Sequence, residues 1–139
     1  VEYERTILEG TEACFADKSC DTLTYSTAAL GNYPLGLEVR SKTMNQYRWV
    51  STDIGDVAVQ RTWLTEPGEA NWESINLDQQ YYVVASMPAE GGMRRVEAGW
   101  VVMELGNLPV PESVALNLAI GSLTAFKGKI EAWKEAHPE

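Results

Sequence analysis

The sequence predicts an α+β domain with a central antiparallel sheet of about five strands, flanked by an N-terminal helix and a long C-terminal helix. Near both ends of the chain, apolar residues recur every three or four positions, which is typical of helices. Between residues 33 and 105, apolar and polar residues alternate, which is typical of half-buried strands. The 139 residues suffice for a hydrophobic core, so we predict a single domain over 1–139.

The first predicted helix covers residues 2–16. Tyr3, Ile7 and Leu8 follow a helical spacing that lines one face, and glutamates occupy the other positions. Residues 16–32 are rich in Asp, Ser, Thr and small side chains. We interpret this segment as a connection that wraps the core, with a short helical turn near 22–30.

Two hairpins are expected next. The alternating segments predict strands at 35–40, 47–51, 57–64, 79–87 and 94–105. Asp53–Asp56 and Pro88–Gly92 have the residue types of tight turns and would close the two hairpins. Residues 65–78 contain proline, glycine and asparagine, and we expect a long loop there that holds Trp72.

The last predicted helix runs from Pro109 to about Ala136. Proline suits a first helical turn because its missing N–H would have no partner there. Beside the large apolar residues runs a stripe of small ones, whose central members are Gly121, Ala125 and Gly128. Glycine inside a helix costs about 1 kcal/mol relative to alanine, so the stripe indicates a closely packed neighbour. That neighbour is either the first helix or the same helix of a second subunit.

The net charge of −9 limits the classes of partner. Proteins that bind nucleic acids concentrate Lys and Arg to neutralise phosphates, whereas this chain has 11 basic against 20 acidic residues. We therefore expect no binding to DNA, RNA or an anionic membrane surface. Apolar runs such as Trp100–Met103 are far too short to span a bilayer.

Cys14 and Cys20 are close in sequence, and an even number of cysteines at close spacing suits a local disulfide in an exported protein. Such a bond would stabilise the fold by about 2 kcal/mol in the chain-entropy model. The alternative is two unrelated free thiols in a cytoplasmic protein. The chain opens at Val1 without methionine, which indicates either a removed leader or a fragment of a longer, membrane-anchored protein. A periplasmic or extracellular location is the favoured interpretation.

Residues for common catalytic chemistries are scarce. His137 is the only histidine and lies three residues from the end, whereas a catalytic imidazole must be held rigidly beside its nucleophile. Two cysteines and this histidine do not make a structural zinc site. Glycine-rich nucleotide-binding motifs are absent. We predict no cofactor and no metal, and the chain is more probable as a binding protein than as an enzyme.

Three carboxylates are candidate functional groups. Asp53 and Asp56 flank a turn and could offer oxygens to calcium, although no EF-hand spacing is present. Glu97 lies in the middle of the fifth predicted strand. If its face is covered, Glu97 would be a buried general base. The alternative, which we favour, is an exposed carboxylate that pairs with an arginine of a neighbouring strand.

Arg61 carries the ligand-binding hypothesis. It interrupts an apolar row on its predicted strand and is followed two residues later by Trp63. Tyr81 and Trp100 have the matching period on the second hairpin. An arginine among aromatic rings is a suitable receptor for a carboxylate, because its planar fork binds both oxygens. The alternative is an arginine that pairs with a surface acid. Trp72, expected to be exposed in its loop, would cap the pocket or anchor a partner.

Three functions remain open. The first is an exported small-molecule-binding or sensory domain with an aromatic and arginine pocket on the sheet. In layout it is similar to PAS-like or Cache-like sensor domains. The second is a protein-interaction module, similar in size and charge to acidic secretion chaperones, that forms a homodimer through its last helix. The third is a small cofactor-free enzyme that uses carboxylates as acid and base.

Overall fold

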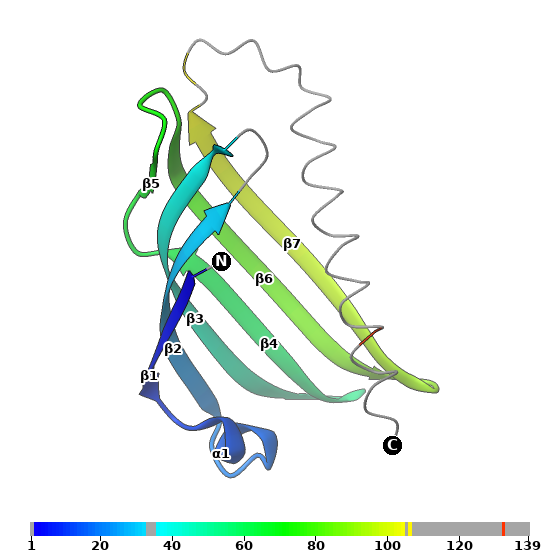
Figure 1. Cartoon of the computed structure of the whole chain (residues 1–139). Coiled ribbons are helices and arrows are strands. Elements are labelled where there is room, and N and C mark those ends of the chain that lie inside the picture. Colours follow the sequence, from blue (N-terminus) through cyan, green and yellow to red (C-terminus); the bar gives the residue numbers. More distant parts are fainter. Residues whose placement is uncertain (1, 33–35, 105, 107–131, 133–139) are drawn as a thin grey trace. The chain divides into compact units, whose positions relative to one another are not determined.

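The computed structural model describes residues 2–32, 36–104, 106 and 132. The chain divides into two compact units, Val1–Gly106 and Asn107–Glu139, and all the described strands belong to the first. In that unit seven strands form one antiparallel sheet with a single short helix (Figure 1). The elements are β1 (Glu2–Glu9), α1 (Glu12–Ala16), β2 (Thr22–Asn32), β3 (Glu38–Thr52), β4 (Gly55–Leu64), β5 (Gly68–Ala70), β6 (Asn76–Ala89) and β7 (Gly92–Glu104).

The strands lie in the order β1, β2, β3, β4, β6, β7, and β5 continues β4 between β3 and β6. Leu64 ends β4 opposite Thr43, and Glu69 of β5 pairs with Arg40 farther along the same strand. If the register of β4 continued unchanged, residue 67 would lie opposite Arg40. Glu69 lies there instead, so the connection contains two extra residues, which form a bulge. Gly68 lies at the bulge because a side chain there would press on the Arg40 carbonyl and the Leu77 side chain.

The α+β prediction is wrong for the described chain, which is mostly β. Residues 2–9 form strand β1 instead of a helix, and only Glu12–Ala16 are helical. The segment predicted as a connection contains the 11-residue strand β2, which pairs with both β1 and β3. Two antiparallel hairpins are present, β3–β4 and β6–β7. The strands expected at 35–40 and 47–51 are instead one strand, β3, and the loop expected at 65–78 contains β5. The sheet has seven strands instead of about five. The predicted helix at 109–136 and its small-residue stripe lie outside the described residues, apart from Ala132.

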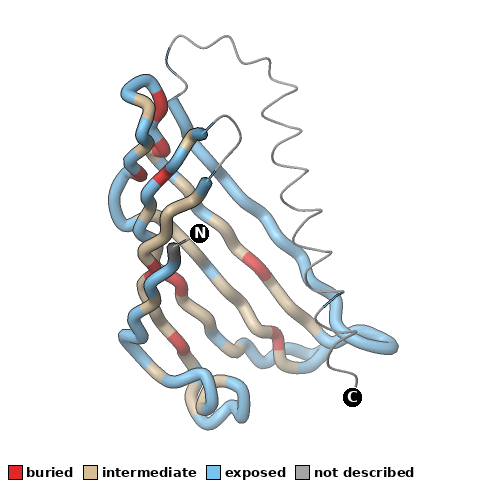
Figure 2. Tube along the Cα trace, viewed as in Figure 1, coloured by how far each residue is buried: buried red, intermediate tan, exposed pale blue. Residues whose placement is uncertain are grey.

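The register assigns the side chains to two faces, which we name after one residue of each. The Asn45 face carries most of the buried side chains: Leu23, Thr27, Val39, Asn45 and Val84. On the Arg61 face, only Val57 is buried among the described strand residues. Figure 2 shows that the buried positions lie in the middle strands, whereas β7 is exposed along its whole length. The core of this unit therefore lies on the Asn45 face.

A polar network occupies the centre of the Asn45 face. The Asn45 side-chain amide donates to the hydroxyls of Thr27 and Thr43, at 3.1 and 3.3 Å. Its carbonyl accepts from the Thr62 hydroxyl at 2.9 Å, and Gln60 donates to Thr62 at 3.2 Å. Buried polar groups are tolerated when they are hydrogen-bonded in this way. The network joins β2, β3 and β4 in one fixed register.

The predicted disulfide between Cys14 and Cys20 is present, with the two Cα atoms 5.3 Å apart. It closes a loop of residues 14–20 that begins within α1, and we call this segment the disulfide loop. Thr11 caps α1 by accepting a hydrogen bond from the Cys14 N–H at 3.1 Å. The disulfide is compatible with a secreted protein, because such bonds persist in oxidising compartments. Among the described residues, no helix has the length and apolar character that a bilayer crossing requires.

Candidate functional site

The register gathers four of the predicted ligand-binding residues on one face of the sheet. Trp63 of β4 pairs with Tyr81 of β6, which in turn pairs with Trp100 of β7. These three residues form a cross-strand series that we call the aromatic row. Arg61 lies two residues before Trp63, so its side chain projects from the same face. The matching periods seen in the sequence therefore correspond to one continuous surface.

The aromatic row becomes more exposed towards the edge of the sheet. Trp63 is half-buried, Tyr81 is 36% exposed and Trp100 is 59% exposed. The Tyr81 and Trp100 rings are tilted against each other with centroids 5.6 Å apart. Valines of the same face, Val96 and Val102, are also about half exposed, at 53% and 49%. A contiguous exposed apolar surface of this kind is typical of binding sites.

Arg61 is held in one orientation by two neighbours. Its Nε–H donates to the Gln46 side-chain oxygen at 2.8 Å, and its guanidinium carbon lies 4.9 Å from the centre of the Trp63 ring. Neither contact uses the terminal nitrogens, and no ion pair to Arg61 occurs within the described part of the chain. The terminal fork is therefore pre-oriented and available for an external acceptor. Arg61 itself is exposed rather than enclosed in a pocket.

The Arg61 face carries charges of both signs. Of the basic residues in β3, β4 and β7, all except Arg95 project from this face. They are Arg40, Lys42, Arg48, Arg61 and Arg94. The same register also places Glu4, Glu38, Glu69 and Glu104 on this face, and Lys42 pairs with Glu66 at 2.8 Å, so the face as a whole has no basic excess. The case for an anionic ligand therefore rests on Arg61 itself.

Trp72 does not join this surface. It lies in the connection between β5 and β6, where its carbonyl accepts from the Ile75 N–H at 3.0 Å. Trp72 is half-buried, so the expectation that it is exposed is wrong. The exposed tryptophan of the sheet is Trp100. The predicted interface residues Gly121, Ala125 and Gly128 lie outside the described residues, as does His137.

The carboxylates form ordinary ion pairs or hydrogen bonds. The Glu97 side chain is 25% exposed and lies 3.4 Å from Arg95. This ion pair lies within β7, whereas the expected partner was an arginine of a neighbouring strand. Asp56 pairs with Lys18 at 2.6 Å and accepts from the Ser51 hydroxyl at 2.8 Å. Nowhere among the described residues do three or more His, Cys, Asp or Glu side chains gather as a metal site would need.

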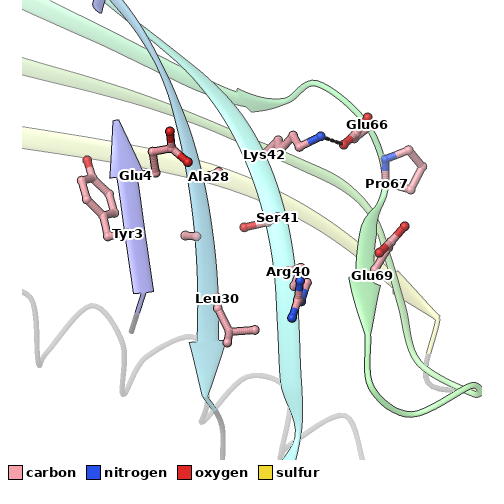
Figure 3. A pocket seen from close by; sticks show the side chains of 11 residues that line it. Tyr3, Glu4, Ala28, Leu30, Arg40, Ser41, Lys42, Glu66, Pro67 and Glu69 are labelled. Carbon is pink, nitrogen blue, oxygen red and sulfur yellow. Dashed lines mark ion pairs between the residues drawn. The ribbon is translucent and has the colours of Figure 1, made fainter. Parts of the chain in front are cut away.

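An open depression of about 530 Å³ lies beside the bulge between β4 and β5 (Figure 3). Ala28 and Leu30 of β2 and Pro67 of the bulge supply apolar lining. Lys42 points across to Glu66, and their charged atoms are 2.8 Å apart. None of the predicted ligand-binding residues lines this depression. The two features are therefore separate.

Sequence reasoning missed a stack of rings and cations on the Asn45 face. Arg5 lies 3.9 Å from the centre of the Tyr25 ring, which stacks on Tyr47 with centroids 5.8 Å apart. The two phenol oxygens are 3.1 Å apart. Burial, and then this hydrogen bond, raise the pKa of Tyr25 far above its ordinary value. Leu23, Tyr25 and Thr27 recur with a period of two, but the small polar residues between them are also common in loops, so the sequence signal for this strand is weak.

The stack continues into the disulfide loop. Phe15 contacts Tyr47 edge-on and stacks on Trp49, with centroids 5.9 and 5.1 Å apart. The Trp49 indole N–H donates to the Phe15 carbonyl at 2.8 Å, and Lys18 lies 4.8 Å from the centre of the Trp49 ring. These contacts attach the loop to β3. We regard the stack as structural, because its members satisfy one another.

Protonation of Asp56 is expected to weaken the attachment of this loop. Hydrogen bonds from Lys18 and Ser51, and then the Lys18 charge, lower the pKa of Asp56 from its ordinary value. A carboxyl group with a lower pKa in the folded state stabilises the fold above its unfolded pKa, and this stabilisation is lost as the pH falls through the folded pKa. We expect Asp56→Asn to lower the melting temperature at pH 7 and to lose that effect progressively below about pH 4.

Thermal unfolding of both proteins between pH 7 and pH 2 measures this difference. Asp53→Asn, in the same turn, is the control and should leave the pH profile unchanged. A deficit of Asp56→Asn that stayed constant down to the lowest pH would contradict the assignment.

No protein-family model, curated protein or solved structure matches this chain.

Proposed function

We propose that this protein is an exported binding or sensory domain that takes a small anionic ligand on the Arg61 face. The observation that carries the proposal is the arrangement of Arg61, which Gln46 and Trp63 hold with its terminal fork free beside the aromatic row. The disulfide supports a periplasmic or extracellular location, where a binding domain would meet small solutes.

The ligand class follows from the two parts of the surface, which are the Arg61 guanidinium and the aromatic row. A carboxylate, or an anion of similar shape, can accept two parallel hydrogen bonds from the guanidinium fork. An apolar planar body then covers Trp63 and Tyr81, and reaches Trp100. Adjacent strands are about 4.8 Å apart, so three neighbouring strands span about 10 Å, the length of a two-ring system. A two-ring aromatic carboxylate has the appropriate size and charge.

The experiment uses 2-naphthoate as the probe and 2-naphthalenemethanol as its neutral counterpart. Isothermal titration calorimetry on the full chain should show that the carboxylate binds about tenfold more tightly, because a charge-assisted pair contributes about 1.5 kcal/mol. Arg61→Gln should remove this preference, and Trp100→Ala should weaken the binding of both probes.

Arg40→Gln is the matched control. It also removes one arginine charge from the Arg61 face, but Arg40 belongs to β3 and lies at a distance from the aromatic row. Its preference for the carboxylate should remain. If Arg61→Gln kept the full preference, or if the parent protein bound neither probe at millimolar concentration, the proposed function would be wrong.

A further inference from the structure

Strand β7 forms an open edge of the sheet. All 13 of its residues are exposed, and among the described residues it pairs only with β6 (Figures 1 and 2). Its apolar side chains include Trp100, Val101 and Val102, at 59%, 49% and 49% exposure. A long apolar edge strand is in general a template for pairing with a further strand, because one side of its backbone is left without a ladder within the sheet.

Two of the features that usually protect such an edge do not occur in the residues of β7 itself. It contains no proline and no lysine, and its register with β6 is regular from Gly92 to Val102. Its four charges are instead distributed in a pattern: Arg94, Arg95 and Glu97 lie in the first half, and Glu104 ends the strand. When two copies of this strand run antiparallel, the basic end of one can lie opposite the acidic end of the other.

We propose that β7 pairs antiparallel with β7 of a second copy, about a twofold axis at Gly99. In this register Arg94 lies opposite Glu104 of the second copy, and the same pair recurs at the other end. Between them, Val96 lies opposite Val102, and Ala98 lies opposite Trp100. All of these side chains project from the Arg61 face of both copies, because the paired positions have the same parity.

Neighbouring registers are less favourable. A twofold axis at Glu97 would place the two Glu97 carboxylates opposite each other, and like charges in that position destabilise a pair. An axis at Ala98 would place Arg94 opposite Val102 and leave Glu104 opposite Gly92. The axis at Gly99 is the one that matches the basic and acidic ends of the strand while it keeps valine opposite valine.

The dimer would extend the binding surface that we propose. Trp100 ends the aromatic row of one copy, and the Ala98 opposite it continues into Val83 and Arg61 of the second copy. The aromatic row of each copy would then adjoin the cross-strand series Ala98, Val83 and Arg61 of the other copy. The pairing of β7 does not depend on the ligand, so either proposal can fail without the other.

Sedimentation equilibrium of the full chain tests the pairing with a charge exchange. Arg94→Glu replaces both end pairs by like charges and should raise the dimer dissociation constant about tenfold. Glu104→Arg should have the same effect. The double variant Arg94→Glu/Glu104→Arg restores both pairs and should return the constant to within about twofold of the parent.

Rescue in the double variant can arise only between copies. Residues 94 and 104 are ten positions apart on one extended strand, about 33 Å, so they do not meet within one chain. Arg40→Glu, which makes the same charge change on β3, is the control and should leave the constant unchanged. A parent protein that stays monomeric at millimolar concentration would overturn the proposal. So would a dimer that is insensitive to the single exchanges, or a double variant that remains as weak as the singles.

Discussion

Replacing Trp49 by alanine is expected to lower the free energy of unfolding by about 3 kcal/mol, the lower end of the range for truncation of a large aromatic residue. The indole stacks on Phe15, donates to the Phe15 carbonyl and lies beside Lys18. Its loss therefore detaches the disulfide loop from β3 at several points. Urea denaturation followed by circular dichroism measures the difference.

Two further variants separate the contributions at this position. Trp49→Phe keeps a ring for stacking and loses the N–H donor, so it should cost about 1 kcal/mol. Trp100→Ala removes the exposed tryptophan of β7 and should change stability by no more than about 0.5 kcal/mol. If truncation at Trp49 cost as little as truncation at Trp100, the stack would not hold the loop to the sheet.

Replacing Asn45 by leucine is expected to cost about 2 to 3 kcal/mol. Leucine has a similar volume but cannot bond to Thr27, Thr43 or Thr62. The hydroxyls of these threonines would then face an apolar side chain on a covered part of the sheet. The midpoint of urea denaturation should fall with little change in the slope of the transition.

The triple variant Asn45→Leu/Thr27→Val/Thr62→Val provides the matched comparison. Removing both sides of a buried hydrogen bond is much less costly than removing one side, so this variant should recover part of the lost stability. If it were less stable than Asn45→Leu by a further 2 kcal/mol, unsatisfied hydroxyls would not explain the first loss.

The hairpins could be predicted from the sequence because their signals are local. Asp53 and Ile54 form the turn between β3 and β4, and Gly91 adopts a positive φ at the turn between β6 and β7. Alternation within β4 also showed that Arg61 and Trp63 share a face, because a period of two fixes which residues of one strand point the same way. That Tyr81 and Trp100 join them is decided by the register between β4, β6 and β7.

The first two strands could not be recognised in the same way. Tyr3 and Ile7 fit a helical spacing and a strand equally well, and Leu8, which seemed to extend the helical face, is 56% exposed on β1. Strand β2 has many threonines and small residues, which are common in loops. Its conformation is decided by pairing with β1 and β3 on its two sides, and that information is not local.

The polar network and the ring stack also depend on register. Thr27, Asn45 and Thr62 belong to three strands and meet only because residue 27 lies opposite residue 43, and residue 45 opposite residue 62. Nothing in the spacing of these residues within the sequence indicates that they interact. The same is true of Arg5 and Tyr25, which pattern analysis had assigned to a helix and a connection.

The bulge between β4 and β5 has a consequence for the connectivity of the chain. Both segments lie between β3 and β6, and each is hydrogen-bonded to both of those strands. The backbone at residues 65–67 therefore joins two pieces that the sheet already holds in line. It is a position where the polypeptide could be lengthened, or its ends relocated, without removing any strand from its place.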